Sequence, residues 1–465
     1  MATLWVRSAT SATVFRSGTK TSRAVFVAGQ GSVWKRVLVD PAALVVMAAC
    51  LGLFLSGIRD IGPWFSPYRW WFIGAIAMGP LGAAARARWV AYRAEHYCLY
   101  AVMAVAAVSC VVSSMPEYSF ARLATFILMF FAVFVAGWAW LQDPRNLTLV
   151  VWLLVASAVL GALASLYYLV NEHGLSPTGR VSGAFGKATG TGSFAAASLP
   201  VVLWKWQYSR GKWRLFFGLI LAVLAYLLVF SGARAALVGG IAATCVWLWK
   251  HHRVLRPALL SGGFLGAMLA AGGVLSLDML PDYIVRKETL PSLTGRIPRW
   301  QVGWDLFLQS PVIGHGYGMT RYIRLYEDGA RLRGQLVPGA FSLLDLMPGS
   351  RPVRLGHMTL HSDQVERLVE TGILGFVPFA GFWLCVLRRV ARVFRSPPSY
   401  DRSLATALGL YVCYIFLDSF MHGALFAINA PGVTVQWLVI AVFMAASERA
   451  LENKPAICAD TSRYS

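Results

Sequence analysis

Residues able to bind an anion or to move a proton are grouped in five short segments that are rich in small residues. The segments are GRVSGAFGKATGTG with Arg180 and Lys187, SGARAAL with Arg234, TGRIPRW with Arg296 and Arg299, PVIGHGYG with His315, and HSDQVERLVETGILGF with His361. A guanidinium group is a planar fork of N–H donors that can bind two phosphate oxygens at once. If these segments meet in the fold, their arginines predict a site for a phosphate or diphosphate group.

His361 has the sequence context of a general base. Ser362, Asp363, Glu366 and Glu370 follow it with the spacing of a helix that begins near His361. The positive end of a helix dipole and nearby arginines both favour the neutral imidazole. A neutral imidazole can accept a proton from a hydroxyl group, so we predict His361 as the catalytic base. The alternative is a structural histidine at the start of that helix.

Other polar residues are candidates for acceptor binding or for support of the same site. They are His315, Arg299, Arg321, Glu370, Asp418 and His422. Asp418 and His422 are four residues apart in one apolar segment, so they either face one cavity or satisfy each other. Arg234 and Arg296 also have simpler alternatives, as a side chain that extends to lipid headgroups and as an ordinary loop residue.

We predict neither a metal site nor a cofactor. The chain contains no His-Glu-x-x-His segment and no Asp-x-Asp segment near these residues. His315 lies among glycines in GHGYG, and this spacing is not that of a dinucleotide-binding loop. The segment is also consistent with a tight turn.

The elements that position these residues are predicted to be membrane helices. Of the 465 residues, 57% are hydrophobic and 14% are charged, whereas a soluble domain is about 25% charged. A helix needs about 20 apolar residues to cross the bilayer. We therefore predict an all-α integral membrane protein with about 12 transmembrane helices, at 37–58, 70–84, 97–115, 119–142, 147–170, 191–208, 213–231, 234–250, 257–277, 372–388, 403–424 and 431–447.

The net charge of +21 does not indicate nucleic-acid binding, because the basic residues lie between the apolar segments. This distribution is the one that orients membrane helices, with basic loops on the cytoplasmic side. With the N-terminus inside, the inner segments hold most of the lysines and arginines. The short outer segments hold only Arg59, Arg69, Arg180, Lys187 and Arg234. We predict a multi-pass protein of the bacterial inner membrane with both termini in the cytoplasm.

The predicted domain organisation follows from this topology. Residues 1–36 are expected to be a disordered cytoplasmic tail, 37–447 one membrane domain, and 448–465 a second cytoplasmic tail. A long loop at 277–360, between predicted helices nine and ten, is expected on the outer face, and loops of this length are usually functional. Within it we predict two short amphipathic helices at the interface, at 297–309 and 319–334.

The five segments form four blocks that, in chain order, resemble the O-antigen ligase and polymerase superfamily of WaaL-like and Wzy-like membrane proteins. GRVSGAFG is similar to the family's Arg-x-x-Gly-x-Phe segment, and SGARAALVGG to its Ser-Gly-x-Arg-x-Ala helix start. TGRIPRWQVGWDLFLQSPVIGHGYG and HSDQVERLVETGILGF resemble the two blocks that follow. The resemblance spans residues 179–376. The family often has Asn after the first block and after the histidine, where this chain has KATGTG and Ser362.

The resemblance implies a membrane glycosyltransferase with its active site on the periplasmic side. It would transfer a glycan from undecaprenyl diphosphate to an acceptor sugar, with inversion and without a metal. Arg234 and Arg296 would bind the donor diphosphate with help from Arg180, and His361 would deprotonate the acceptor hydroxyl. The acceptor is lipid A–core in ligases and a second lipid-linked repeat unit in polymerases. The residues do not separate these two, and membrane lipids are the other expected partner.

The competing interpretation is a transporter, either a lipid-linked oligosaccharide flippase or a polysaccharide exporter. Such a protein should have cations deep in a central cavity. Here the charged residues within apolar segments are few, namely Asp40, Arg122 and Asp418. A long outer loop also has no evident role in a flippase, so the sequence favours the enzyme.

Overall fold

The computed structural model describes residues 41–55, 57–58, 68, 71, 73–75, 93–171, 180–252, 256, 296–328, 331–336, 360–397, 399–421 and 431–452. Helices account for most of these residues. The long helices are α2 (Pro41–Leu55), α5 (Ala94–Val111), α6 (Pro116–Met129), α8 (Pro144–Val170), α9 (Ala188–Tyr208), α10 (Gly211–Phe230), α11 (Arg234–His251), α14 (Arg296–Gln309), α15 (Asp363–Arg395), α16 (Tyr400–Met421) and α17 (Pro431–Leu451). A π-helical turn at Phe130–Ala136 and the short α7 (Gly137–Trp140) continue α6.

Seven helices in the described part of the chain are long and apolar enough to cross a membrane. They are Ala94–Val111, Pro116–Trp140, Pro144–Val170, Gly211–Phe230, Asp363–Arg395, Tyr400–Met421 and Val433–Leu451. This confirms a helical membrane protein. The helices α9 and α11 occupy two further predicted spans. The predicted span 257–277 and most of 70–84 lie outside the described residues, so the total of twelve stays a prediction.

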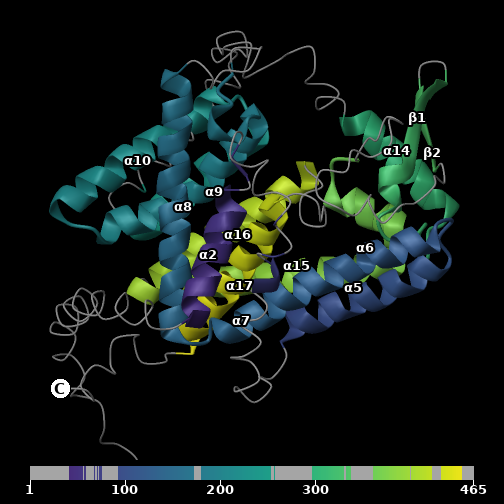
Figure 1. The fold of residues 1–465 in the computed structure, drawn as a ribbon, viewed down its shortest axis with the longest axis horizontal. Coiled ribbons are helices and arrows are strands. Elements are labelled where there is room, and N and C mark those ends of the chain that lie inside the picture. The colour runs from purple at the N-terminus through teal and green to yellow at the C-terminus, as the bar shows by residue number, and fades with distance from the viewer. Residues whose placement is uncertain are drawn as a thin grey trace, which may run out of the picture.

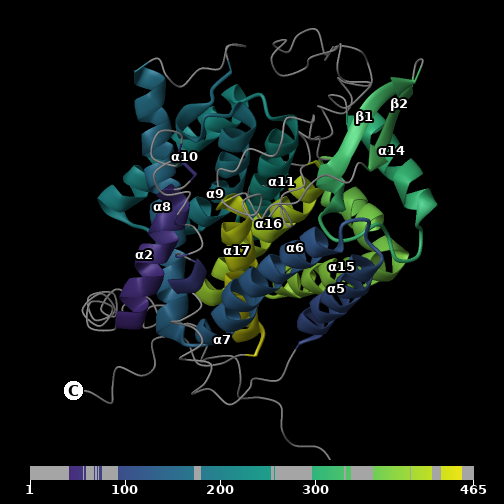
Figure 2. The same cartoon turned by 45° about the vertical axis from the view of Figure 1, so that its right-hand side comes forward.

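The helices pack around α16 and α17, which lie in the middle of the bundle (Figure 1). The helices α2 and α8 are on one side, whereas α5, α6 and α15 are on the other, as the turned view also shows (Figure 2). Buried aromatic rings fill the centre: Trp437 of α17 lies 5.9 Å from Phe130, 5.6 Å from Phe134 and 5.7 Å from Phe382 between ring centroids. Such pairs contribute about 0.5–1.5 kcal/mol each beyond the burial of apolar area.

Of the two short helices predicted in the long loop, one is confirmed as a helix and the other is wrong, and their place at the interface stays a prediction. The helix α14 matches the prediction at 297–309. Residues 319–334 instead form a 3₁₀ turn (Met319–Tyr322) and the antiparallel strands β1 (Ile323–Asp328) and β2 (Arg331–Leu336), with Ile323 opposite Leu336. Apolar and polar residues alternate in IRL and LRGQL, and Asp328-Gly329 is a frequent hairpin dipeptide. These strands add a small sheet to the predicted all-α fold.

The helix α15 consists of two helical pieces that meet at Gly372. Gly372 has φ 60° and ψ −167°, which only glycine adopts readily. The N–H groups of Ile373 and Leu374 donate to the carbonyls of Pro311 and Val312 at 2.9 and 3.2 Å. A Cβ atom on Gly372 would collide with the Val312 carbonyl. The loop after α14 therefore fits into this kink and holds the first turns of α15 in place.

A second, smaller apolar core connects these pieces. It contains Val302 and Leu306 of α14, Ile323 of β1, Leu360, and Val369 of α15, all at most 2% exposed. In both views α14 and the hairpin lie together at one end of α15 (Figures 1 and 2). This core links the Arg296 helix to the His361 segment.

Candidate functional site

Arg180 lies against the turn that precedes α11. Its Nε donates to the carbonyl oxygen of Ser231 at 2.7 Å, and the Val181 N–H donates to the Phe230 carbonyl at 3.0 Å. Arg234 is the first residue of α11, just after this turn. Arg180 and Arg234 are therefore positioned by the same turn, although 54 positions (234 − 180) separate them in the chain.

The small residues around this turn allow close backbone approach. A Cβ atom on Gly192 of α9 would lie 2.6 Å from the Cβ of Ala233 and 2.5 Å from the Oγ of Ser231. Only a glycine at 192 lets α9 come this near to the start of α11. The glycines and serines of the two segments thus determine where the arginines lie.

Arg296 lies within electrostatic reach of Arg234, Arg299 and Asp418. Burial lowers the pKa of the Arg296 guanidinium, Asp418 raises it, and Arg299 and Arg234 lower it further. Asp418, near the end of α16, is 5% exposed. Arginine stays protonated at any ordinary pH, so these groups form a local excess of positive charge. We call Arg180, Arg234, Arg296 and Arg299 the cation cluster.

Asp418 is held by α16 and connects the cluster to α11. The hydroxyl of Tyr414 donates to Asp418 Oδ1 at 3.3 Å. A Cβ on Gly239 of α11 would lie 2.8 Å from the Tyr414 ring, so this helix also packs tightly there. His422, which was predicted either to face one cavity with Asp418 or to satisfy it, lies outside the described residues.

The start of α15 brings His361 to the same end of α16. Ser362 caps the helix, since its Oγ accepts from the Val365 N–H at 3.5 Å. Gln364 Nε2 donates to the Oγ of Ser419, the residue after Asp418, at 2.8 Å. The prediction of a helix beginning near His361 is therefore confirmed.

His361 has an unusual backbone conformation. Its φ is 55°, the only positive φ of a residue other than glycine in the described part of the chain. A conformation of this kind costs about 1–3 kcal/mol and persists where the surroundings hold it, often at functional sites. The half-buried imidazole is thus carried on a strained residue directly before the helix cap.

His315 is part of the connection between α14 and α15. Its Nε2 lies 2.8 Å from the Leu306 carbonyl, and its N–H donates to the Val369 carbonyl at 2.9 Å. Because a carbonyl only accepts, Nε2 carries the proton in this bond. Gly314, Gly316 and other glycines of the loop have positive φ, as expected for the tight-turn alternative.

Glu370 lies in a buried polar cluster beside the kink. It forms an ion pair with Arg367 and accepts a hydrogen bond from the Thr320 hydroxyl. The Arg367 guanidinium lies 4.7 Å from the centre of the Tyr317 ring. Arg321 interacts electrostatically with Arg122 and Glu366 of this cluster. The predicted candidates Glu370 and Arg321 thus lie beside the first turns of α15.

Several of these residues were not predicted from the sequence. Gln364 lies in the His361 segment but has no predicted role, Ser419 and Tyr414 lie in none of the quoted segments, and only the packing of α15 and α16 brings the three together. The ion pair of Arg367 and Glu370 has the i, i+3 helical spacing, which is a signal that the sequence does contain.

The region that holds most of this site has a known counterpart. Residues 219–380 match the family model of O-antigen ligase. The predicted resemblance to the O-antigen ligase and polymerase superfamily is confirmed over these residues, which include Arg234, Arg296 and His361. Arg180 lies before the matched region. A comparison with curated proteins gives no match. The O-antigen ligase match supports an enzyme of the ligase or polymerase class.

Proposed function

We propose that this protein transfers a glycan from undecaprenyl diphosphate to an acceptor sugar, as an O-antigen ligase or a surface-polysaccharide polymerase. The reaction takes place on the periplasmic face of the bacterial inner membrane, with both termini in the cytoplasm. One observation carries the proposal: Arg296 lies within electrostatic reach of Arg234, which belongs to a separate segment of the O-antigen ligase region, and of Asp418.

The cation cluster suits the leaving group of this reaction. As the bond between the anomeric carbon and the diphosphate oxygen breaks, the electron pair stays on that oxygen and negative charge develops. Fixed guanidinium groups stabilise this charge and replace the metal that other glycosyltransferases use. Asp418 orients Arg296 and limits the repulsion among the arginines.

His361 supplies the base in this mechanism. The acceptor hydroxyl gives its proton to the imidazole while its oxygen forms the new bond to the anomeric carbon. Attack opposite to the departing diphosphate inverts the configuration at that carbon. The strained backbone of His361 and the capped start of α15 fix the backbone from which the ring extends, and a base must be positioned in this way.

The far ends of the helices support an enzyme rather than a transporter. Arg389 of α15 pairs with Glu95 of α5 at 2.9 Å and with Glu448 of α17 at 3.5 Å, and Arg93 pairs with Glu448 at 3.1 Å. These pairs, of which those of Arg389 are buried, join the helices at the end opposite to His361. A transporter would have to open this end during its cycle.

The test is glycan transfer by the purified protein with EDTA present. The donor is undecaprenyl-diphosphate glycan, and the acceptor is lipid A–core in one series and a second lipid-linked unit in the other. We expect wild type to transfer to one acceptor, and the His361→Ala variant to bind donor but to lose at least about 100-fold in rate. His252→Ala is the matched control, because His252 directly follows α11, at the end of that helix opposite to Arg234. A fully active His361→Ala variant contradicts the assigned base, and absence of transfer to either acceptor contradicts the proposed function.

A further inference from the structure

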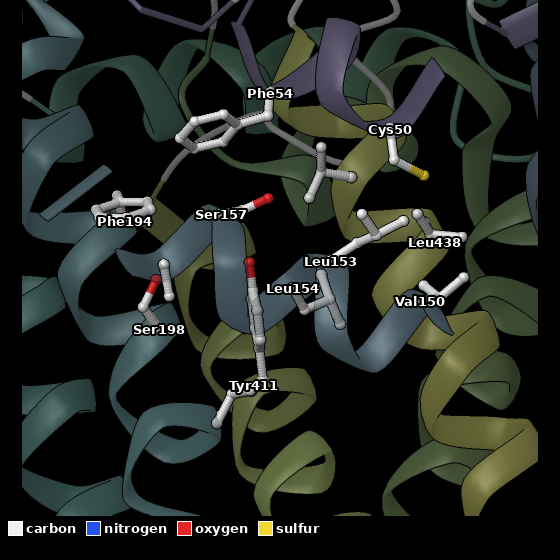
Figure 3. Close-up of a pocket in the computed structure, with 13 residues that line it drawn as sticks. Cys50, Phe54, Val150, Leu153, Leu154, Ser157, Phe194, Ser198, Tyr411 and Leu438 are labelled. Atoms are coloured by element: carbon white, nitrogen blue, oxygen red, sulfur yellow. The ribbon is translucent and has the colours of Figure 1, made fainter. Parts of the chain in front are cut away.

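A cavity of about 80 Å³ lies among α2, α8, α9, α16 and α17 (Figure 3). Its walls are mainly apolar, with Phe54, Leu153, Phe194 and Leu438 among them. Binding sites for small molecules likewise have mainly apolar walls and a few polar groups. The cavity is distinct from the cation cluster, because its Tyr411 precedes Asp418 on α16 by two helical turns, about 10 Å.

Three hydroxyl groups from three helices face this cavity. They belong to Ser157 of α8, Ser198 of α9 and Tyr411 of α16. Figure 3 shows Tyr411 extending into the cavity with its hydroxyl toward Ser157. Among the residues that the structure describes, none of the three hydroxyls has a hydrogen-bond partner. Ser198 is only 6% exposed, so it is shielded from the surroundings of the bundle.

Other hydroxyls in these helices do have partners. Thr148 of α8 donates to the Pro144 carbonyl at 2.8 Å, and Ser447 of α17 donates to the Met444 carbonyl at 2.8 Å. Serine and threonine in helices commonly bond to the preceding turn in this way. An unsatisfied hydroxyl in an apolar environment is unfavourable. Three that face one cavity therefore indicate a ligand with a polar group.

The composition of the walls limits the charge of that ligand. None of the lining residues in the described part of the chain is Asp, Glu, Lys, Arg or His. A charged ligand would be buried within the bundle without a counter-ion, which is costly. A hydroxyl both donates and accepts, so the three groups fit the oxygen of an alcohol.

We propose that this cavity binds a neutral, mainly apolar molecule from the membrane that carries one alcohol group. The apolar body of the ligand packs against Phe54, Phe194 and Leu438. Its oxygen is held among Ser157, Ser198 and Tyr411. The site does not depend on the glycan transfer proposed above.

Photoaffinity labelling of the full-length protein in lipid nanodiscs tests this site. The probe is a six-carbon alcohol with a diazirine in its chain, and the labelled residues are located by mass spectrometry. The competitors are hexan-1-ol and hexane, which differ only in the hydroxyl group. We expect cross-links on cavity residues of α8, α9 and α16. We also expect the alcohol to compete about tenfold better than the alkane, as one or two hydrogen bonds would give.

A double variant, Ser198→Ala with Tyr411→Phe, removes two hydroxyls and keeps the apolar shape. Cavity labelling should fall at least about fivefold. The matched control Ser447→Ala, a buried serine bonded within its own helix, should label as wild type does. Thermal melts verify folding of all variants. Equal labelling of the double variant and wild type, equal competition by the two competitors, or cross-links only outside the cavity would each overturn the proposal. If the cavity holds only water, cross-links will form only outside it.

Discussion

The Nε atom of Arg180 donates a hydrogen bond to the carbonyl oxygen of Ser231 over 2.7 Å. This bond joins the segment before α9 to the turn that carries Arg234. Arg180 therefore fixes the position of another arginine and adds its own charge to the same region. Lysine would keep the charge but has no Nε–H in this position.

Arg180→Lys should therefore raise the donor KM about tenfold, because a hydrogen bond from a charged group is worth about 1.5–3 kcal/mol. The KM follows from initial rates at varied lipid-linked donor. Arg210→Lys, an exposed residue before α10, serves as the control. An unchanged KM in Arg180→Lys would mean that only the charge of Arg180 is needed.

Asp418→Asn should separate binding from turnover. The variant keeps the shape of the side chain but removes the negative charge that faces Arg296. The cation cluster then attracts the diphosphate at least as strongly, while Arg296 loses its orienting partner. We expect kcat to fall about tenfold with no increase of the donor KM. A higher KM with an unchanged kcat would instead place Asp418 in donor binding.

Gly372→Ala should disturb the site from a distance. The backbone angles of Gly372 strongly disfavour a side chain, and a Cβ would collide with the Val312 carbonyl. We expect a loss of about 2–4 kcal/mol in stability and reduced transfer, because the first turns of α15 can no longer fit the loop after α14. Thermal unfolding in detergent measures the first effect. Gly218→Ala, whose Cβ would make only an ordinary contact at 3.5 Å, should melt like wild type.

Arg389→Ala should lower stability without changing the chemistry. Arg389 forms buried pairs with Glu95 and Glu448 at the end of α15 far from His361. Removal of one partner from such a network costs about 3–5 kcal/mol. The melting temperature should fall, while kcat per folded molecule stays the same. The exposed Arg392→Ala is the comparison, and a specific loss of kcat in Arg389→Ala would mean that this end takes part in the reaction.

Salt should weaken donor binding. The cation cluster is at least partly open to solvent, since Arg234 and Arg296 are half-buried, and charges of this kind are screened within about 10 Å at 0.1 M salt. Titration of sodium chloride should raise the donor KM steadily and leave kcat nearly constant. A donor KM independent of salt would contradict a diphosphate held mainly by charge.

The apolar helices could be predicted from the sequence because a membrane span needs a long apolar run, which is a local property. The hairpin at 323–336 could not be predicted by amphipathic pattern alone, since a short segment with alternating leucines and arginines suits both a helix and a strand. The kink was missed for a different reason. In the sequence, Gly372 is the first residue of the predicted span 372–388. Its kinked backbone conformation follows only from its contact with the loop after α14.

The arginines of the cation cluster could be predicted from the sequence, because they lie in short segments that are rich in small residues. The hydrogen-bond partners in this region could not be predicted. Nothing in the chain pairs Arg180 with Ser231, Gln364 with Ser419 or Tyr414 with Asp418 before α15 and α16 are packed. For His315, the sequence allowed a role in the site. In the structure, its side chain contacts the Leu306 carbonyl and helps to connect α14 with α15.

Binding of the lipid diphosphate is the most direct test of the central claim. The affinity of the purified protein for undecaprenyl-diphosphate glycan is measured for wild type, for Arg234→Gln with Arg296→Gln, and for the control Arg214→Gln with Arg392→Gln. We predict that the first double variant loses at least about 100-fold in affinity, as two bidentate contacts would require, while the control binds like wild type. Equal affinity of all three proteins would contradict the assignment of the diphosphate site to the cation cluster.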